Sequence, residues 1–309
     1  MPFDTSLDNA PKTLARLARA AGARPDLTQG GGGNVSLKLN SERMIIKASG
    51  VKLKDVSPES GYTLVNYGNI RRRIASGPGG EGEFSDYIRA QALPVKGVKA
   101  AKPSIETGFH SLLNTVVIHT HSVYANILNM SAEGHALGKK IFPQAEFIAY
   151  KSPGPQLCSA INDRARASGP QIFFLANHGL AVANAGVLGA LELNERVNDT
   201  IRRGLCLPPY PAIQAAAGLT AHNSARLAYY GMGFMVENTL SPDQALYCGP
   251  EALEGRGDME AANEVLTALF YILDCIKALG LTPMFLSKAD VLYFDAMKSG
   301  RCKREGSSG

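Results

Sequence analysis

The pattern of apolar and polar positions changes between a period of 3.6 and a period of two along the chain, which predicts an α/β protein. Residues 11–21 show the helical pattern: Leu14, Leu17 and Ala18 share one face, a proline opens the segment and Gly22 ends it. Residues 34–39 and 44–47 show the strand pattern on either side of a turn-like "NSER", which predicts a β-hairpin. The further expected elements are a helix at about 104–113, a strand at 115–121, a strand–turn–strand unit at 172–182, and helices at 186–203 and about 258–279.

Two stretches rich in Gly and Pro separate these elements. Residues 76–104 are expected to form a long loop, and "CLPPYP" at 206–211 breaks the helix that precedes it. We therefore predict a main domain over residues 1–210 and a smaller α/β extension over residues 211–309, packed on the core. In the extension, "ALYC" at 245–248 and "PMFL" at 283–286 are expected to be short strands, and the tail "KREGSSG" to be frayed.

The composition narrows the class of protein. Of 309 residues, 45% are hydrophobic and 19% are charged, without an apolar run long enough to span a membrane, which predicts a soluble protein. We expect a cytoplasmic location and reduced thiols, because we find no secretory signal and the five cysteines form no CxxC pair. The net charge of +5 comes largely from "RRR" at 71–73 and "RCKRE" at 301–305. Neither nucleic acid nor a membrane is expected as a partner, whereas a small anionic substrate stays open.

Candidate chemistry is concentrated in "ETGFHSLLNTVVIHTH" at 106–121, which holds three of the six histidines. On a strand, alternate side chains share a face, so His119 and His121 point the same way with Cα atoms about 6–7 Å apart. Two imidazoles at this spacing can bind one metal ion, and His178, in the turn after the other apolar strand, is the candidate third ligand. The alternative is that each ring is a core histidine held by a local hydrogen bond.

Two neighbouring features bear on this chemistry. Glu106 lies one helical turn before His110, so both point toward the following strand, where Glu106 could act as a ligand or general base. A surface carboxylate near a helix N-terminus is the alternative for Glu106, and His110 is expected to be structural or to orient other groups. The run "QGGGGNVS" at 29–36 could hold a phosphate through its backbone N–H groups, or could be a flexible loop.

The segments "GGGNVSLK", "IIKASG", "PSIETGFH", "VVIHTH" and "LANHGLAV" occur in the order of the class II aldolase/adducin family, which the chain resembles over about residues 12–205. Fuculose-phosphate and rhamnulose-phosphate aldolases typify this family. The resemblance implies an α/β/α sandwich around a mainly antiparallel sheet, usually assembled as a homotetramer. The extension after residue 210 lies outside the resemblance.

The resemblance also implies roles for particular residues. His119, His121 and His178 match the histidines that bind one divalent metal ion per chain, usually Zn²⁺. Glu106 matches the catalytic acid/base. The positions that match the phosphate-binding residues are Gly33, Asn34, Ser49, Gly50 and Ser104. The implied reaction is retro-aldol cleavage of a ketose 1-phosphate into dihydroxyacetone phosphate and an aldehyde.

Departures from the family pattern leave the reaction open. Only thirteen positions separate Glu106 from His119, fewer than in the fuculose type, and "PSIET" is similar to a segment of rhamnulose aldolase/dehydrogenase fusions. The proton-donating tyrosine of some members has no clear match, and Tyr150 and Tyr229 are guesses. Epimerisation, dehydration or decarboxylation of a sugar phosphate is the alternative function. A non-catalytic adducin-like scaffold would have no use for an intact set of metal ligands.

Overall fold

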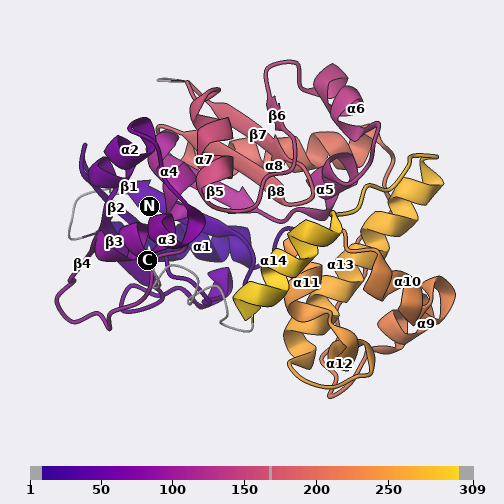
Figure 1. Ribbon diagram of the computed structural model, residues 1–309. Coiled ribbons are helices and arrows are strands. Elements are labelled where there is room, and N and C mark those ends of the chain that lie inside the picture. The colour runs from indigo at the N-terminus through magenta and orange to yellow at the C-terminus, as the bar shows by residue number, and fades with distance from the viewer. Residues whose placement is uncertain (1–8, 167–168, 299–309) are drawn as a thin grey trace.

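The computed structural model describes residues 9–166 and 169–298, which form an eight-stranded sheet with helices on both faces (Figure 1). The strand order is β4-β3-β2-β1-β5-β8-β7-β6, and every neighbouring pair is antiparallel except β6 and β7. The strands are β1 Asn34–Lys38, β2 Arg43–Lys47, β3 Tyr62–Asn66, β4 Ala92–Leu93, β5 Val116–Thr120, β6 Glu146–Ile148, β7 Gln171–Leu175 and β8 Gly179–Asn184.

The two faces of this sheet carry different side chains, because successive residues of a strand point to opposite sides. In β5, Val116 and Ile118 belong to the larger hydrophobic cluster, whereas Val117 belongs to a separate cluster on the other face. His119 follows the phase of Val117 and lies on that second face. Asn34 of β1 pairs with His119 in register, so it shares the same face.

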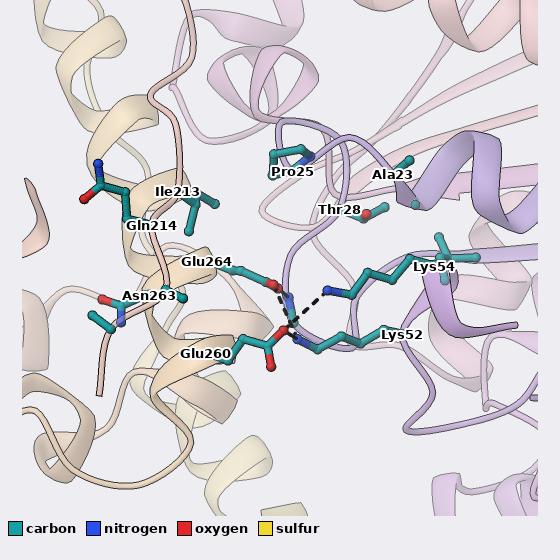
Figure 2. A pocket seen from close by; sticks show the side chains of 15 residues that line it. Ala23, Pro25, Thr28, Lys52, Lys54, Ile213, Gln214, Glu260, Asn263 and Glu264 are labelled. Carbon is teal, nitrogen blue, oxygen red and sulfur yellow. Dashed lines mark hydrogen bonds and ion pairs between the residues drawn. The ribbon is translucent and has the colours of Figure 1, made fainter. Parts of the chain in front are cut away.

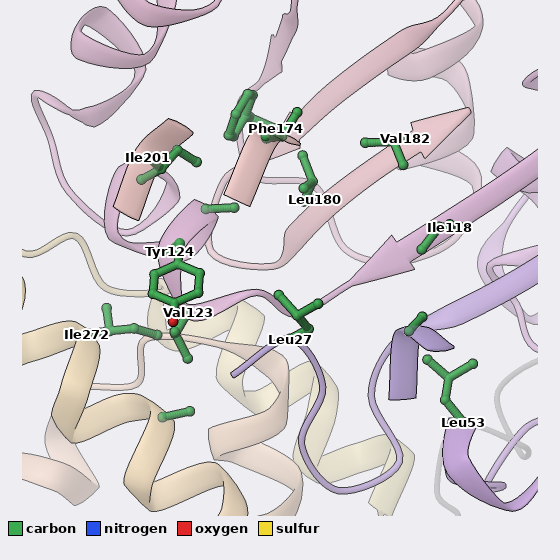
Figure 3. Packing of buried hydrophobic residues seen from close by; sticks show 14 of the residues in the cluster. Leu27, Leu53, Ile118, Val123, Tyr124, Phe174, Leu180, Val182, Ile201 and Ile272 are labelled. Atoms are coloured by element: carbon green, nitrogen blue, oxygen red, sulfur yellow. The ribbon is translucent and has the colours of Figure 1, made fainter. Parts of the chain in front are cut away.

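Helices complete both outer layers of the sandwich. The first face is covered by α1 Ala10–Gly22, α5 Val123–Asn129 and α8 Val187–Gly204, and the second by α2 Tyr67–Ala75, α3 Glu81–Ala90, α4 Thr107–Leu112 and α7 Pro155–Asn162. Figure 3 shows Ile118 and Val182 of the sheet in one cluster with Tyr124 of α5 and Ile201 of α8. Fully burying one such aliphatic side chain stabilises the fold by about 1.5–3 kcal/mol, which holds these layers together.

Several expected elements are confirmed. The helix at 11–21 is α1, the hairpin is β1–β2, the unit at 172–182 is β7–β8 with His178 in its turn, and the later helices are α8 and α13 Met259–Ala278. The long loop expected at 76–104 is wrong, because α3 and β4 lie within it. Phe84 and Ile88 lie one helical turn apart and are 0% and 1% exposed, so this short apolar stripe suffices to dock α3 on the second face.

The extension is helical rather than α/β. Besides α13 it contains α9 Ala221–Tyr230, α10 Met232–Glu237, α11 Pro242–Tyr247, α12 Pro250–Leu253 and α14 Lys288–Lys298. The two expected strands are wrong: "ALYC" closes α11, and "PMFL" makes only an isolated bridge from Pro283 to Ser131. Ser241 caps α11 by accepting from the backbone N–H of Gln244, and Pro242 starts the helix. These start signals outweigh a short run of β-like residues.

The extension lies against the main domain. Leu269 and Ile272 of α13 belong to the same buried cluster as Val123 and Ile127 of α5. The domain boundary near residue 210 stays a prediction, and the tail at 303–309 lies outside the described residues. In the described part of the chain, no helix combines the length and apolar character needed to cross a membrane.

Candidate metal centre and active site

Three separate segments place four side chains around one point. His119 lies in β5, His121 follows the end of that strand, and His178 occupies the β7–β8 turn. Glu106 is the N-cap residue of α4, the helix that covers the same face of the sheet. One potential ligand atom from each of these four residues lies within 4.8 Å of the other three. The structure therefore brings together the four residues that the sequence singled out for metal and acid/base chemistry.

The distances between these atoms have the size expected around a metal ion. Glu106 Oε1 lies 3.3 Å from His119 Nε2 and 3.2 Å from His178 Nε2. His121 Nε2 lies 3.2 Å from His119 Nε2. Ligand atoms at about 2.0–2.1 Å from one tetrahedral ion are separated by about 3.3 Å. These three separations fit one tetrahedral ion. The two potential ligand atoms that lie farthest apart would have to move closer together on binding it.

In two of the rings, the hydrogen bond made by Nδ1 determines that the lone pair lies on Nε2. His119 Nδ1 donates to the carbonyl of Leu180 at 3.0 Å, and His121 Nδ1 donates to the carboxylate of Asp243. Because a carbonyl and a carboxylate oxygen accept hydrogen bonds, Nδ1 of each ring carries hydrogen, and a ring without a second proton presents a lone pair at Nε2. Two lone pairs facing each other at 3.2 Å repel unless a proton or a cation lies between them. The donor set therefore fits a divalent metal ion.

Glu106 is an ionised carboxylate in this surrounding. Burial alone would raise its pKa, but the charge and hydrogen bonds that His119 and His178 supply when their Nε2 atoms carry protons outweigh burial and hold the pKa of Glu106 well below the usual range. Asn34 Nδ2 donates to Glu106 Oε2 at 3.3 Å, and the backbone N–H of Glu106 donates to Ser104 Oγ at 3.3 Å. These contacts turn Oε1 toward the histidines. The interpretation as a solvent-exposed surface carboxylate does not fit this position.

His110 lies outside the cluster. Its Nδ1 contacts Ser36 Oγ of β1 at 2.8 Å, and the ring is fully buried. Burial lowers the pKa of His110 to about 3, so the ring is neutral. This placement agrees with the expectation of a structural or orienting histidine.

Several backbone N–H groups of the glycine run, which an anion-binding nest would need free, already donate hydrogen bonds within the protein. Gly30 N donates to the Glu264 carboxylate at 2.6 Å, Gly31 N donates to the Tyr247 hydroxyl at 3.1 Å, and Gly32 N donates to a backbone carbonyl at 2.9 Å. These three N–H groups are thus used within the protein. Gly32 and Asn34 are parts of the run that adjoin the metal cluster, since Gly32 packs against the His121 ring and Asn34 contacts Glu106.

The other expected phosphate-binding residues come from two adjacent loops. Ser49 N donates to Lys102 O at 2.8 Å, and a bridge joins Ala48 to Pro103, so Ser49 and Gly50 lie beside the segment that carries Ser104. Ser49 and Gly50 are exposed. The Oδ1 atom of Asn34 is buried and lacks a hydrogen-bond partner among the described residues, which suits a donor group on a ligand.

Three residues that the sequence patterns did not single out support these loops. Lys47 Nζ donates to the carbonyls of Gly31 and Val51 at 3.2 and 2.7 Å, and thereby ties the glycine run to the loop after β2. Burial of Lys47 lowers its pKa to about 8, against the opposing influence of nearby carboxylates. A lysine at a buried position of an apolar strand was a possible signal. The sequence patterns offered no comparable signal for Asp243 and Asn177, which are described below.

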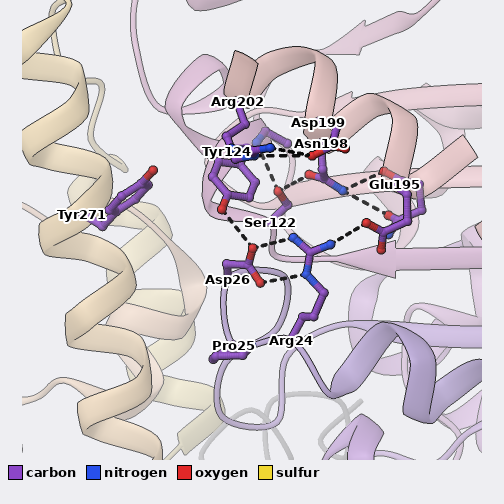
Figure 4. Close-up of polar contacts among 12 residues, drawn as sticks. Arg24, Pro25, Asp26, Ser122, Tyr124, Glu195, Asn198, Asp199, Arg202 and Tyr271 are labelled. Atoms are coloured by element: carbon purple, nitrogen blue, oxygen red, sulfur yellow. Dashed lines mark hydrogen bonds and ion pairs between the residues drawn. The ribbon is translucent and has the colours of Figure 1, made fainter. Parts of the chain in front are cut away.

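A polar network braces the segments on either side of the cluster (Figure 4). Arg24 donates to Asp26 at 2.6 and 3.1 Å and pairs with Glu195 of α8, while the Tyr124 hydroxyl donates to Asp26 at 2.9 Å. Next to His121, Ser122 donates to Asn198 of α8. The loop before the glycine run and the residue after His121 are therefore both fixed to helices of the first face.

Sequence comparisons find proteins that are similar to this chain. A sequence model of the family described as Class II Aldolase and Adducin N-terminal domain matches residues 12–203. The 3-oxo-tetronate 4-phosphate decarboxylase of Haemophilus influenzae is 25% identical over 191 residues, which are 57% of this chain and 77% of that protein.

A solved structure shows the same fold, and others are similar to this chain. The N-terminal class II aldolase domain of a conserved protein from Thermoplasma acidophilum has a TM-score of 0.58 at 20% identity, over 65% of this chain and 96% of that one. A sugar-phosphate aldolase from Thermotoga maritima has a TM-score of 0.44 at 17% identity, over 65% of this chain and 97% of that one. The expected fold class, a mainly antiparallel sheet between helical layers, is confirmed by the topology of the sheet and by the similarity to the Thermoplasma acidophilum domain.

Proposed function

Because the chain belongs to the class II aldolase and adducin family, we propose that it is a divalent-metal-dependent lyase that cleaves a carbon–carbon bond of a small phosphorylated sugar. The observation that carries this proposal is the clustering of Glu106 with three imidazole rings, with one potential ligand atom of each residue within 4.8 Å of the others. An adducin-like scaffold would gain nothing from a buried cluster of this composition. Retro-aldol cleavage of a ketose 1-phosphate is the reaction we place first.

The histidines and Glu106 divide the chemical work in this proposal. A divalent ion held by His119, His121 and His178 would supply Lewis acidity to the carbonyl and neighbouring hydroxyl oxygens of the substrate. Glu106 takes the proton from the hydroxyl next to the bond that breaks. A carboxylate is ionised near neutral pH, so Glu106 is available as a base. Asn34 holds the second carboxylate oxygen and so orients the base.

We propose that the phosphate lies near the residues matched by the resemblance. Gly33 and Asn34 at the end of the glycine run adjoin the cluster, and Ser49, Gly50 and Ser104 lie on the two loops joined by the Ala48–Pro103 bridge. The exposed Ser49 hydroxyl is a suitable donor for an anion. We further propose Zn²⁺ as the metal, since a His₃ donor set suits it, together with a homotetrameric assembly and a cytoplasmic location.

Decarboxylation is the second candidate, and it is favoured by the similarity to a 3-oxo-tetronate 4-phosphate decarboxylase. Both reactions break a carbon–carbon bond next to a carbonyl group and leave an electron pair on carbon. They differ in the role of Glu106. Retro-aldol cleavage requires a base for the hydroxyl proton, whereas a carboxylate that leaves as carbon dioxide requires none.

A substrate panel separates these candidates. The metal-loaded protein is incubated with ketose 1-phosphates and with phosphorylated 3-oxo sugar acids, and the products are resolved by mass spectrometry. Retro-aldol cleavage gives two fragments that add up to the substrate, decarboxylation gives loss of carbon dioxide, dehydration gives loss of water, and epimerisation leaves the mass unchanged. Metal analysis of protein prepared without chelator should find about one divalent ion per chain. A protein that retains no metal and turns over no member of the panel would refute the proposed function.

A further inference from the structure

We propose that Asp243, from the C-terminal extension, is a positioning residue for the candidate metal ligand His121. The inference rests on the metal centre proposed above. It assigns part of that centre to a segment outside residues 12–203, over which the family model matches. Asp243 acts through the imidazole ring rather than on the substrate.

The contact between the two side chains is direct and buried. His121 Nδ1 donates to Asp243 Oδ2, and the two residues are 7% and 8% exposed. The carboxylate holds the proton of the ring on Nδ1 and therefore turns the Nε2 lone pair toward His119 and His178. It also places a negative charge behind the ring, which raises the basicity of a ligating imidazole.

Asp243 is held in place by the helix that carries it. Asp243 and Tyr247 lie four residues apart on α11, and both side chains reach the main domain. Tyr247 accepts a hydrogen bond from Gly31 N while Asp243 contacts His121. The Gln244 side chain fixes the start of α11 through Leu240 N at 2.8 Å and Met235 O at 2.8 Å. This bracing gives the carboxylate one orientation.

Three further hydrogen bonds join the extension to other parts of the centre. Asn177, which precedes His178 and has a φ of 53°, donates to Leu240 O at 2.9 Å and to Met284 O at 2.7 Å. Glu264 of α13 accepts from Gly30 N at 2.6 Å. The His178 turn and the glycine run are therefore both fastened to the extension.

Ion pairs between the segment after β2 and α13 reinforce this docking (Figure 2). Lys52 lies 2.7 Å from Glu260 and 3.3 Å from Glu264, and Lys54 lies 3.4 Å from Glu260. A cavity of about 460 Å³ adjoins these pairs, and its lining includes none of the four cluster residues. The ion pairs thus locate the extension, and Asp243 is the group through which the extension touches a candidate ligand.

The test measures metal affinity together with the state of the ring. Asp243→Ala removes the acceptor and the charge, whereas Asp243→Asn keeps an oxygen acceptor and removes the charge. We measure the Zn²⁺ dissociation constant of the full-length protein by competition with a chromophoric chelator. Loss of such a partner typically weakens metal binding about 10- to 100-fold, and we expect that range for Asp243→Ala with Asp243→Asn in between.

The matched control is Asp258→Asn, which removes a carboxylate from the same extension. Asp258 caps α13 by accepting from Ala261 N at 3.2 Å, and asparagine caps helices equally well, so its metal affinity should equal that of wild type. The second readout is the ¹⁵N spectrum of the histidine rings in metal-free protein. His121 should be protonated on Nδ1 in wild type and in Asp243→Asn, and should become a mixture of tautomers in Asp243→Ala.

The outcomes separate this inference from the proposed function. Wild-type protein that binds no divalent ion would overturn the metal centre and this inference with it. If wild type binds metal, and Asp243→Ala binds it equally well with an unchanged His121 tautomer, only the inference is overturned. If Asp243→Ala does not fold, Asp243→Asn decides the question, because an affinity equal to wild type would exclude a role for the charge behind the ring.

Discussion

Replacing Glu106 with glutamine tests whether this carboxylate is the base of the proposed reaction. Glutamine has the same shape, so its side chain can still accept from Asn34 Nδ2, and the backbone contact with Ser104 is unchanged. What disappears is the negative charge 3.2–3.3 Å from two imidazole nitrogens, and with it the ability to take a proton. We therefore expect a protein that folds and binds metal but turns over slowly.

The size of the expected loss in rate follows from the role of Glu106 as a general base. A positioned general base contributes about 10²–10⁴ in rate, which is about 2.7–5.4 kcal/mol on the barrier at 1.36 kcal/mol per factor of ten. The three histidine nitrogens remain in the Glu106→Gln variant, so we expect the metal content to change little. The loss should appear in kcat, because the base acts when the bond breaks rather than when substrate binds.

The assay compares wild type, Glu106→Gln and the control Glu146→Gln at equal metal content. Glu146 lies in β6 at the edge of the sheet and pairs only with Arg166 at 3.4 Å among the ion pairs of the described residues, so its substitution should leave kcat unchanged. A metal-loaded Glu106→Gln variant with nearly wild-type kcat for retro-aldol cleavage would refute the assignment of the base. Retained turnover with release of carbon dioxide would favour decarboxylation instead.

Three further predictions concern neighbouring residues. Ser49→Ala should raise KM for a phosphorylated substrate at least several-fold with little change in thermal stability, because Ser49 is exposed; an equal KM would remove Ser49 from the phosphate site. Gly32→Ala would place a Cβ atom 2.4 Å from His121 Nδ1, so metal affinity should fall about tenfold or more, whereas Gly82→Ala, with open space around it, should bind metal as wild type does. Burial lowers the pKa of Lys38 from 10.5 to about 7, so the unfolded chain binds more protons between these values. Denaturant titrations should therefore show that the free energy of unfolding of wild type, relative to that of Lys38→Met, rises from pH 7 to pH 10. A difference in unfolding free energy that stays constant over this range would contradict the prediction.

The elements that the sequence predicted well are those with a clear local period. Burial on one face imposes that period on the sequence. This is why we predicted correctly the β1–β2 hairpin, the β7–β8 unit and helices α1, α8 and α13. The same argument placed His119 and His121 on one side of their strand. The elements that were missed have weak local signals: α3 docks through two apolar residues, and the residues of "ALYC" suit a strand as well as the end of a helix.

The same distinction between local pattern and tertiary packing applies to the candidate site. The sequence by itself determined which side chains were available for chemistry, because His119, His121, His178 and Glu106 stand in patterns whose geometry is local to a strand, a turn or a helix. Only the tertiary structure decided that Asp243 lies behind His121, 122 positions away in the chain, and that Glu264 and Tyr247 occupy N–H groups of the glycine run. The physical reason is that a backbone period specifies the face on which a residue lies. Which residue meets it across the interior depends on how whole layers pack, and no local pattern contains that information.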